Sequence, residues 1–245
     1  MREDRVNWFS KLITILTYTF ILAPMIIIVA VSFNPSAGHT DFVTGFANSI
    51  KIAVIATIFD IFIGVFASLS VTKYNFKGKS LLVSFFTSPM FIPSISFAFV
   101  LMRTTASIKM FTPFTKILIG HIVIILPYII RNTMSVLINF NWTLEDAAAS
   151  LGANPRQVFF KITLPLIKPG IISGAMLAFL YSFDEAVISS FLTSAKFTTM
   201  PIQIINYMEF QFDPTVAAIA TILMASSLII MLVINKLVGL DSMVN

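Results

Sequence analysis

Acidic residues inside apolar stretches are the places where this 245-residue chain has the clearest capacity for chemistry. Asp184 and Glu185 stand side by side in the apolar stretch 169–193, and Asp60 lies midway through the stretch 49–72. Ionised groups are costly in such surroundings, and where they occur they usually mark a path for an ion or a substrate. Because carboxylates in a low-dielectric cavity attract ammonium groups, these residues predict a path for a cationic substrate.

Two further acids, Glu209 and Asp213, lie in or next to the segment that precedes the last apolar stretch and extend the predicted path. The alternative for each acid is a structural role, as half of a buried pair or as a cap at a helix break. On one helix, Asp184 and Glu185 would point about 100° apart. We therefore expect one of them to line the path and the other to meet a basic residue or a helix N-terminus.

Enzymatic and metal chemistry find little support in the sequence. The chain has no cysteine, which excludes disulfides, thiolate metal sites and cysteine nucleophiles, and its two histidines argue against structural zinc. His121 fits either a substrate contact or a structural histidine whose nitrogens are hydrogen-bonded. With no recognisable catalytic triad, we predict that the chain is not an enzyme and that it binds no cofactor itself.

The composition indicates an integral membrane protein. Hydrophobic residues make up 57% and charged residues 11% of the chain, against roughly 25% charged residues in ordinary soluble domains. The mean hydropathy of +0.93 agrees. The formal charge of +5 comes from dispersed residues without a basic run, so we do not expect nucleic acid as a partner.

About six stretches have the roughly 20 apolar residues that a transmembrane helix needs. They are 11–33, 49–72, 80–102, 117–138, 169–193 and 215–238. The first is longer than the roughly 7–15 residues of a signal-peptide core, so we expect it to be a retained helix. Pro89 and Pro93 make 80–102 the least suited of the six to a straight helix.

Lysine and arginine counts predict the orientation of the chain. Ten of these residues lie in one set of connecting pieces, 1–11, 73–79, 139–168 and 236–245. Four lie in the other set, 34–48, 103–116 and 194–214. Since positive charge is enriched on the cytoplasmic side, both termini and the long loop 139–168 are expected there.

The loop 139–168 has the signals of two short, rigid helices. Thr143 and Asp146 resemble a capping box, the alanines that follow favour helix, and Gly152 is a natural stop. Asn154–Pro155 then predicts the start of a second helix. We expect that helix to end at Leu164–Pro165, before the fifth span begins.

The spacing within this loop resembles the signature of ATP-binding-cassette (ABC) importer permeases, which is E-A-A, three residues, G, nine residues, I-x-L-P. Asp146–Ala147–Ala148 is followed after three residues by Gly152, and after nine more by the sequence from Ile162 to Pro165. The one departure is Asp146 at the glutamate position, beside Glu145. Aspartate keeps the charge with a shorter reach, so an ion pair to a partner would be altered.

The resemblance implies an all-α, type I ABC importer permease fold, with residues 1–245 as one transmembrane domain in the inner membrane of a bacterium. It implies that the loop docks on a cytoplasmic ATPase. The residues expected to couple the two are Glu145, Asp146, Ala147, Ala148, Gly152, Ile162, Leu164 and Pro165. The implied partners are a second permease that forms a heterodimer with this chain, two copies of an ATPase that bind ATP and magnesium, and an extracytoplasmic solute-binding protein.

A second resemblance concerns the substrate. Ser182–Phe183–Asp184–Glu185, Thr198–Thr199–Met200–Pro201 and Asp213–Pro214–Thr215 are similar to S-F-D-E, T-T-L-P and D-P-T in the second permease of spermidine/putrescine importers. This similarity implies a polyamine substrate. Permeases for ferric iron, phosphonate or thiosulfate share weaker versions and are the alternative. A stand-alone secondary transporter should show inverted repeats, and we find none.

Overall fold

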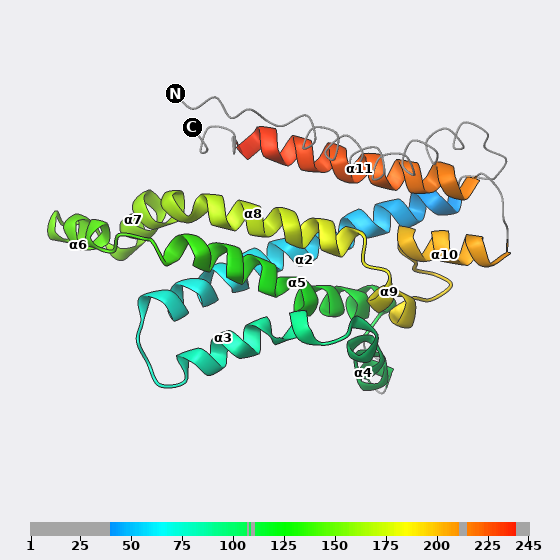
Figure 1. Cartoon of the computed structure of the whole chain (residues 1–245), viewed down its shortest axis with the longest axis horizontal. Coiled ribbons are helices and arrows are strands. Elements are labelled where there is room, and N and C mark those ends of the chain that lie inside the picture. Colours follow the sequence, from blue (N-terminus) through cyan, green and yellow to red (C-terminus); the bar gives the residue numbers. More distant parts are fainter. Residues whose placement is uncertain (1–39, 107, 109–110, 211–214, 239–245) are drawn as a thin grey trace, which may run out of the picture.

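The computed structural model describes residues 40–106, 108, 111–210 and 215–238, and it is helical throughout these ranges apart from short connections, with no β-strand among them. Three long helices, numbered as in Figure 1, run side by side through the molecule. They are α2 (Thr40–Lys73), α5 (Pro113–Leu137) and α8 (Leu164–Phe183). At 1.5 Å per residue α2 is about 50 Å long, more than the roughly 30 Å of a bilayer's hydrocarbon core.

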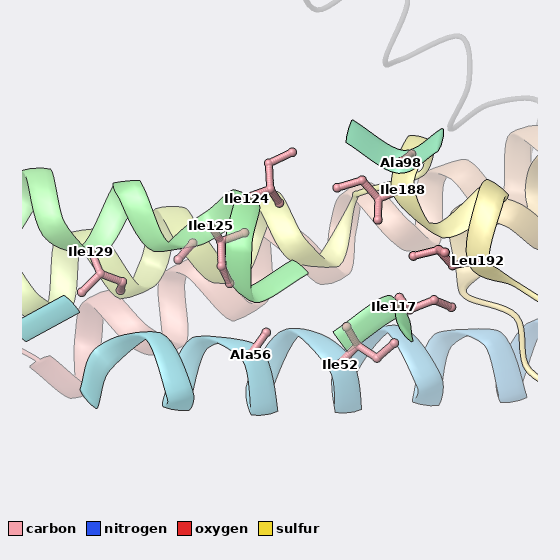
Figure 2. Close-up of a cluster of buried hydrophobic side chains, with 10 residues drawn as sticks. Ile52, Ala56, Ala98, Ile117, Ile124, Ile125, Ile129, Ile188 and Leu192 are labelled. Atoms are coloured by element: carbon pink, nitrogen blue, oxygen red, sulfur yellow. The ribbon is translucent and has the colours of Figure 1, made fainter. Parts of the chain in front are cut away.

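The long helices pack through small and branched apolar side chains. One buried cluster joins α2, α5 and α8 to α4 (Ser94–Ala106) and α9 (Val187–Leu192), and Figure 2 shows its side chains pointing toward one another. Its members are Ile52, Ala56, Ala98, Ile117, Ile124, Ile125, Ile129, Ala178, Ile188 and Leu192. A Cβ atom on Gly174 would lie 2.9 Å from the Cα of Ile129, so this glycine lets α8 approach the α5 backbone closely.

Among the described residues, three helical segments can cross a membrane by length and composition, and a bent pair would make a fourth. The three are Phe42–Lys73, Pro113–Leu137 and Pro155–Phe183. Of the other predicted spans, 11–33 lies outside the described residues, and 215–238 coincides with α11 (Thr215–Val238).

The predicted span 80–102 is sharply bent. Its first half is α3 (Lys79–Thr87) with the short turn η1 (Ser88–Phe91), and α4 continues at an angle of 101°. Ile92 between them is extended, with φ −87° and ψ 128°. The reason is steric, because the ring of Pro93 excludes the preceding residue from the helical region.

The fifth span departs from its prediction at both ends. Instead of stopping at Leu164–Pro165, the chain is helical from α7 (Pro155–Val158) through a π-helical turn, η2 (Phe159–Thr163), into α8. The wider turn takes the place of the α-helical turn in which the ring of Pro165 would clash with a backbone carbonyl. The prediction of one helix to residue 193 was also wrong, since α8 ends at Phe183 and α9 follows after a short break.

The two ends of the bundle differ in what they display. One end, called the α6 end below, has α6 (Thr143–Ser150), α7 and the connection from α2 to α3. The other, the α9 end, has α9 and α10 (Met200–Phe210) beside the beginning of α2 (Figure 1). Each end contains one of the two groups of residues singled out in the sequence.

Candidate functional site

The helix α6 is short, and a hydrogen-bonded stop fixes its C-terminal end. Its N-cap is Trp142 and the expected capping box at Thr143 is absent, because the Thr143 hydroxyl donates to Asn141 Oδ1 over 2.7 Å. At the C-terminus Gly152 has a φ of +85°. Its N–H donates to the carbonyl of Ala149, and that of the next residue to the carbonyl of Ala148. This double hydrogen bond is a Schellman motif, and it confirms Gly152 as the stop.

The start of α7 is equally well defined. Asn154 Oδ1 accepts a hydrogen bond from Gln157 N over 2.9 Å, and Asn154 N donates to Gln157 Oε1 over 2.9 Å. Pro155 occupies the first turn, where its missing N–H costs nothing. This reciprocal capping box confirms the predicted start of the helix. The two residues Gly152–Ala153 form the corner between the capped C-terminus of α6 and the capped N-terminus of α7.

Most residues of the signature lie on the surface of this end. Asp146, Ala147, Gly152 and Pro165 are exposed, while Ala148, Ile162 and Leu164 are partly buried. Leu151, which the sequence did not single out, is 90% exposed at the tip. A small acidic and apolar surface therefore projects from the bundle on a stiff support.

Glu145 does not belong to that surface. It is 9% exposed, forms an ion pair with Lys73 at the end of α2, and accepts a hydrogen bond from Thr163 Oγ1 over 2.5 Å. Lys73 Nζ also lies 5.4 Å from the centre of the Trp142 ring. Sequence reasoning missed Lys73 and Thr163, because these partners are 72 and 18 residues from Glu145 and no local pattern connects them.

Beside this ion pair lies a hollow of about 530 Å³ between the end of α2, α6 and α7. Its walls include Phe66, Lys73, Ala149, Ala153 and Pro155. The hollow gives the α6 end a concave side next to the projecting surface.

At the α9 end, Asp184 is exposed and lines a second hollow of about 640 Å³. The other walls are largely apolar and come from α8, α10 and α11, with Ser227 as a further polar group. They include Leu180, Pro201, Ile204, Ile205, Leu223 and Leu228. Glu209 is exposed on α10 but does not line this hollow.

Glu185 has a different environment from its neighbour. It is 6% exposed, and its Oε1 accepts a hydrogen bond from Ile188 N over 3.0 Å in the first turn of α9. A carboxylate at this position satisfies a free N–H group of the helix and interacts favourably with its N-terminal dipole. The two acids were expected to point in different directions on one continuous helix. Instead, α8 ends at Phe183, and the side chains of Asp184 and Glu185 have different surroundings in the break that follows.

Asp60, another predicted path residue, lines neither of these hollows. Asp60 is fully buried in α2, and neither carboxylate oxygen has a hydrogen-bond partner among the described residues. Asp213 lies outside the described residues. A substrate role for Asp60 stays a prediction.

His121 fixes the break that carries the acidic pair. It is 1% exposed in α5, its Nδ1 lies 2.7 Å from Ser182 Oγ, and its Nε2 lies 3.1 Å from Ser189 Oγ. Ser182 precedes the break and Ser189 follows it, so one imidazole holds both sides. This is the arrangement of a structural histidine with both ring nitrogens satisfied.

Taken together, long apolar helices, a stiff projecting helix at one end and an acid-lined hollow at the other define a membrane transport subunit. Residues 60–240 match the family of the binding-protein-dependent transport system inner membrane component. The chain belongs to this family, the permeases of ABC importers, as the signature spacing predicted.

Similar proteins agree with this assignment. The chain is 28% identical to the spermidine/putrescine transport system permease protein PotC of Escherichia coli over 91% of each chain. It is 29% identical to the putrescine transport system permease protein PotI of the same species, over 87% of this chain and 85% of that one. A bacterial ABC transporter involved in alginate import has the same fold, with a TM-score of 0.72, 19% identity and coverage of 96% and 98%.

The His121 arrangement leads to a testable prediction. His121→Phe keeps the ring volume and removes both nitrogens, so it should lower the free energy of unfolding by about 2 kcal/mol, roughly 1 for each lost hydrogen bond. Thermal unfolding in detergent measures the change. Ser182→Ala should destabilise the wild type and have little further effect in the His121→Phe background. Additive effects would contradict the shared contact.

Proposed function

We propose that this chain is a permease subunit of a polyamine importer and carries spermidine or putrescine across the membrane. Two observations support a polyamine as the substrate. The chain is similar over about nine-tenths of its length to a permease protein of a spermidine/putrescine transport system, and Asp184 offers an exposed carboxylate beside an apolar hollow. The second observation carries the proposal, because it concerns residues of this chain.

The chemistry of the hollow suits a polyamine. A polyamine alternates ammonium groups with short methylene chains. An ammonium group binds a carboxylate through charge-assisted hydrogen bonds, and methylenes are favoured against apolar walls such as Leu180, Ile204 and Leu223. A single carboxylate binds a cation weakly enough to release it again, and a transport path needs both binding and release. Anionic solutes such as phosphonate or thiosulfate would be repelled at the same place.

The two neighbouring acids provide a matched test. Asp184→Asn should lower polyamine uptake about tenfold with assembly intact, since a hydrogen bond to a charged group contributes roughly 1.5–3 kcal/mol. Glu185→Gln should instead lower the thermal stability and yield of the complex, because Glu185 caps α9. Both substitutions keep the side-chain shape and remove one charge. Uptake of radiolabelled spermidine and putrescine into reconstituted vesicles, with gel filtration for yield, measures both effects.

Each result has a separate meaning. If Asp184→Asn took up polyamine at the wild-type rate, the hollow beside Asp184 would not be part of the substrate path. If wild-type vesicles containing the whole importer took up neither polyamine, the substrate proposal would be wrong while the family assignment stood.

We further propose that the α6 end docks on an ATPase carried by a separate chain. The complex would comprise a second permease, two ATPase copies that bind ATP and magnesium, and an extracytoplasmic binding protein. The projecting surface with Asp146, Ala147 and Leu151 supports this, because a partner that transmits movement needs a stiff contact. ATP-driven closure of the ATPases would then shift the permeases between inward-open and outward-open states.

The docking surface can be tested with one bulky side chain. Ala147→Trp should lower retention of the ATPase at least about tenfold, because an indole at a closely packed contact holds the surfaces apart. Copurification of the ATPase with a tagged permease is the measurement. Thr104→Trp, at an exposed position of α4, is the control for bulk alone. If Ala147→Trp retained the ATPase and took up substrate as the wild type does, α6 would not be part of the interface with the ATPase.

Docking on a cytoplasmic ATPase requires the α6 end to lie in the cytoplasm, and the lysine and arginine counts predict that both termini lie on the same side. The chain has no native cysteine, so single cysteines report topology cleanly. In intact spheroplasts an impermeant thiol reagent should label Ala195→Cys near the α9 end and leave Lys77→Cys unlabelled until the membrane is permeabilised. Both positions are exposed. The reverse pattern would invert the proposed topology.

A further inference from the structure

The ion pair between Lys73 and Glu145 is a polar contact that joins the last turn of α2 to α6. The helical elements packed against α6 are α7 and η2, which lead directly into α8. Lys73 lies in the last turn of α2 and reaches α6 with its side chain. This contact therefore links α6 to α2 in addition to α8.

The contact is more specific than an exposed surface ion pair. Glu145 is 9% exposed, and its two oxygens have different partners, the ammonium of Lys73 on Oε2 and the hydroxyl of Thr163 on Oε1. Thr163 is buried in the π-helical turn. Lys73 also lies over the Trp142 ring, which orients its cationic end. A carboxylate with fixed partners on both oxygens sets the position of its helix in a way that a solvated pair does not.

We infer that Lys73, Glu145 and Thr163 form a coupling strut, which makes α2 follow the movement of α6 when the ATPase acts. Glu145 is then a positioning residue inside the permease, whereas the resemblance grouped it with the residues expected to couple to the ATPase. The inference rests on the proposed docking of α6. Different residues then bind the ATPase and transmit its movement. Asp146 and Ala147 lie on the docking surface, and Glu145 lies behind it.

Transmission to α2 matters because of what α2 contacts. This helix packs along α5 and α8 and contributes Ile52 and Ala56 to the central cluster. With the strut in place, a displacement of α6 reaches the bundle through α2 and α8 together. Without it, α6 keeps its covalent connections to α5 and α8 and the apolar contacts of Trp142, and the wide π-helical turn between α6 and α8 can absorb part of the displacement.

The first test separates transmission from docking. In vesicles containing the complete importer, Glu145→Gln and Lys73→Met should lower polyamine uptake per ATP hydrolysed about tenfold, within the usual range of coupling energies. ATPase retention and ATP hydrolysis should stay near wild-type levels. Lys77→Met, which removes a positive charge from the exposed connection after α2, should change neither quantity.

Exchange of the two charges controls for simple loss of structure. The double variant Lys73→Glu with Glu145→Lys should recover part of the lost uptake, since the Thr163 hydroxyl can accept a hydrogen bond from lysine. Thr163→Val, which removes only the hydroxyl, should show a milder loss. Loss of ATPase retention in Glu145→Gln would make Glu145 a docking residue and overturn the inference. Wild-type uptake per ATP in both single variants would overturn it as well.

A second readout does not depend on the substrate. Spin labels on cysteines at Ile63 in α2 and Ser150 in α6, both exposed, report the distance between these helices in the full complex. With the strut intact, a nonhydrolysable ATP analogue should leave this distance distribution unchanged, whereas in the Glu145→Gln background it should shift or broaden. A distribution that responds equally in both backgrounds would contradict the strut. Failure of the wild-type chain to bind the ATPase would refute the proposed docking itself.

Discussion

The constraint on which this structure depends is that a bilayer offers no hydrogen-bond partners to the protein backbone. Each N–H and C=O group in the membrane must be satisfied within the chain, and a continuous helix does this with local contacts alone. The long segments α2, α5 and α8 follow from that requirement. They then pack through small and branched side chains, because between lipid-exposed helices close contact takes the place of the hydrophobic effect.

Under this constraint, an interruption of a helix is expensive and is found where it serves a purpose. The break after Phe183 is compensated by Glu185, which accepts from an N–H of α9, and by His121, which holds a serine on each side. These contacts leave Asp184 as the exposed acid of the pair. A structural histidine and a structural glutamate thus present one carboxylate to the hollow at the α9 end.

The α6 end follows the same logic outside the long helices. Its backbone is satisfied by a Schellman motif at Gly152 and a capping box at Asn154, so the corner between α6 and α7 is rigid without extensive packing. Its internal charge, Glu145, is compensated by Lys73, while Asp146 stays exposed. At both ends of the molecule, adjacent acids are divided between one that supports the structure and one that is available to a partner or a ligand.

The sequence by itself determined the membrane class, the permease family, the stop at Gly152 and the start at Asn154. Each of these depends on composition, on a fixed spacing along the chain, or on residues a few positions apart. It did not determine the continuation of α7 through Pro165 into α8, nor the break after Phe183, where packing and a π-helical turn outweigh local propensity. Which acid of each pair is buried, in Asp184–Glu185 and in Asp146–Glu145, was decided by the tertiary structure. Glu185 meets an N–H only three residues on, but it does so because the helix breaks after Phe183, and the ion-pair partner of Glu145 lies 72 residues away. Neighbouring residues of the same charge give no local sign of which will be buried.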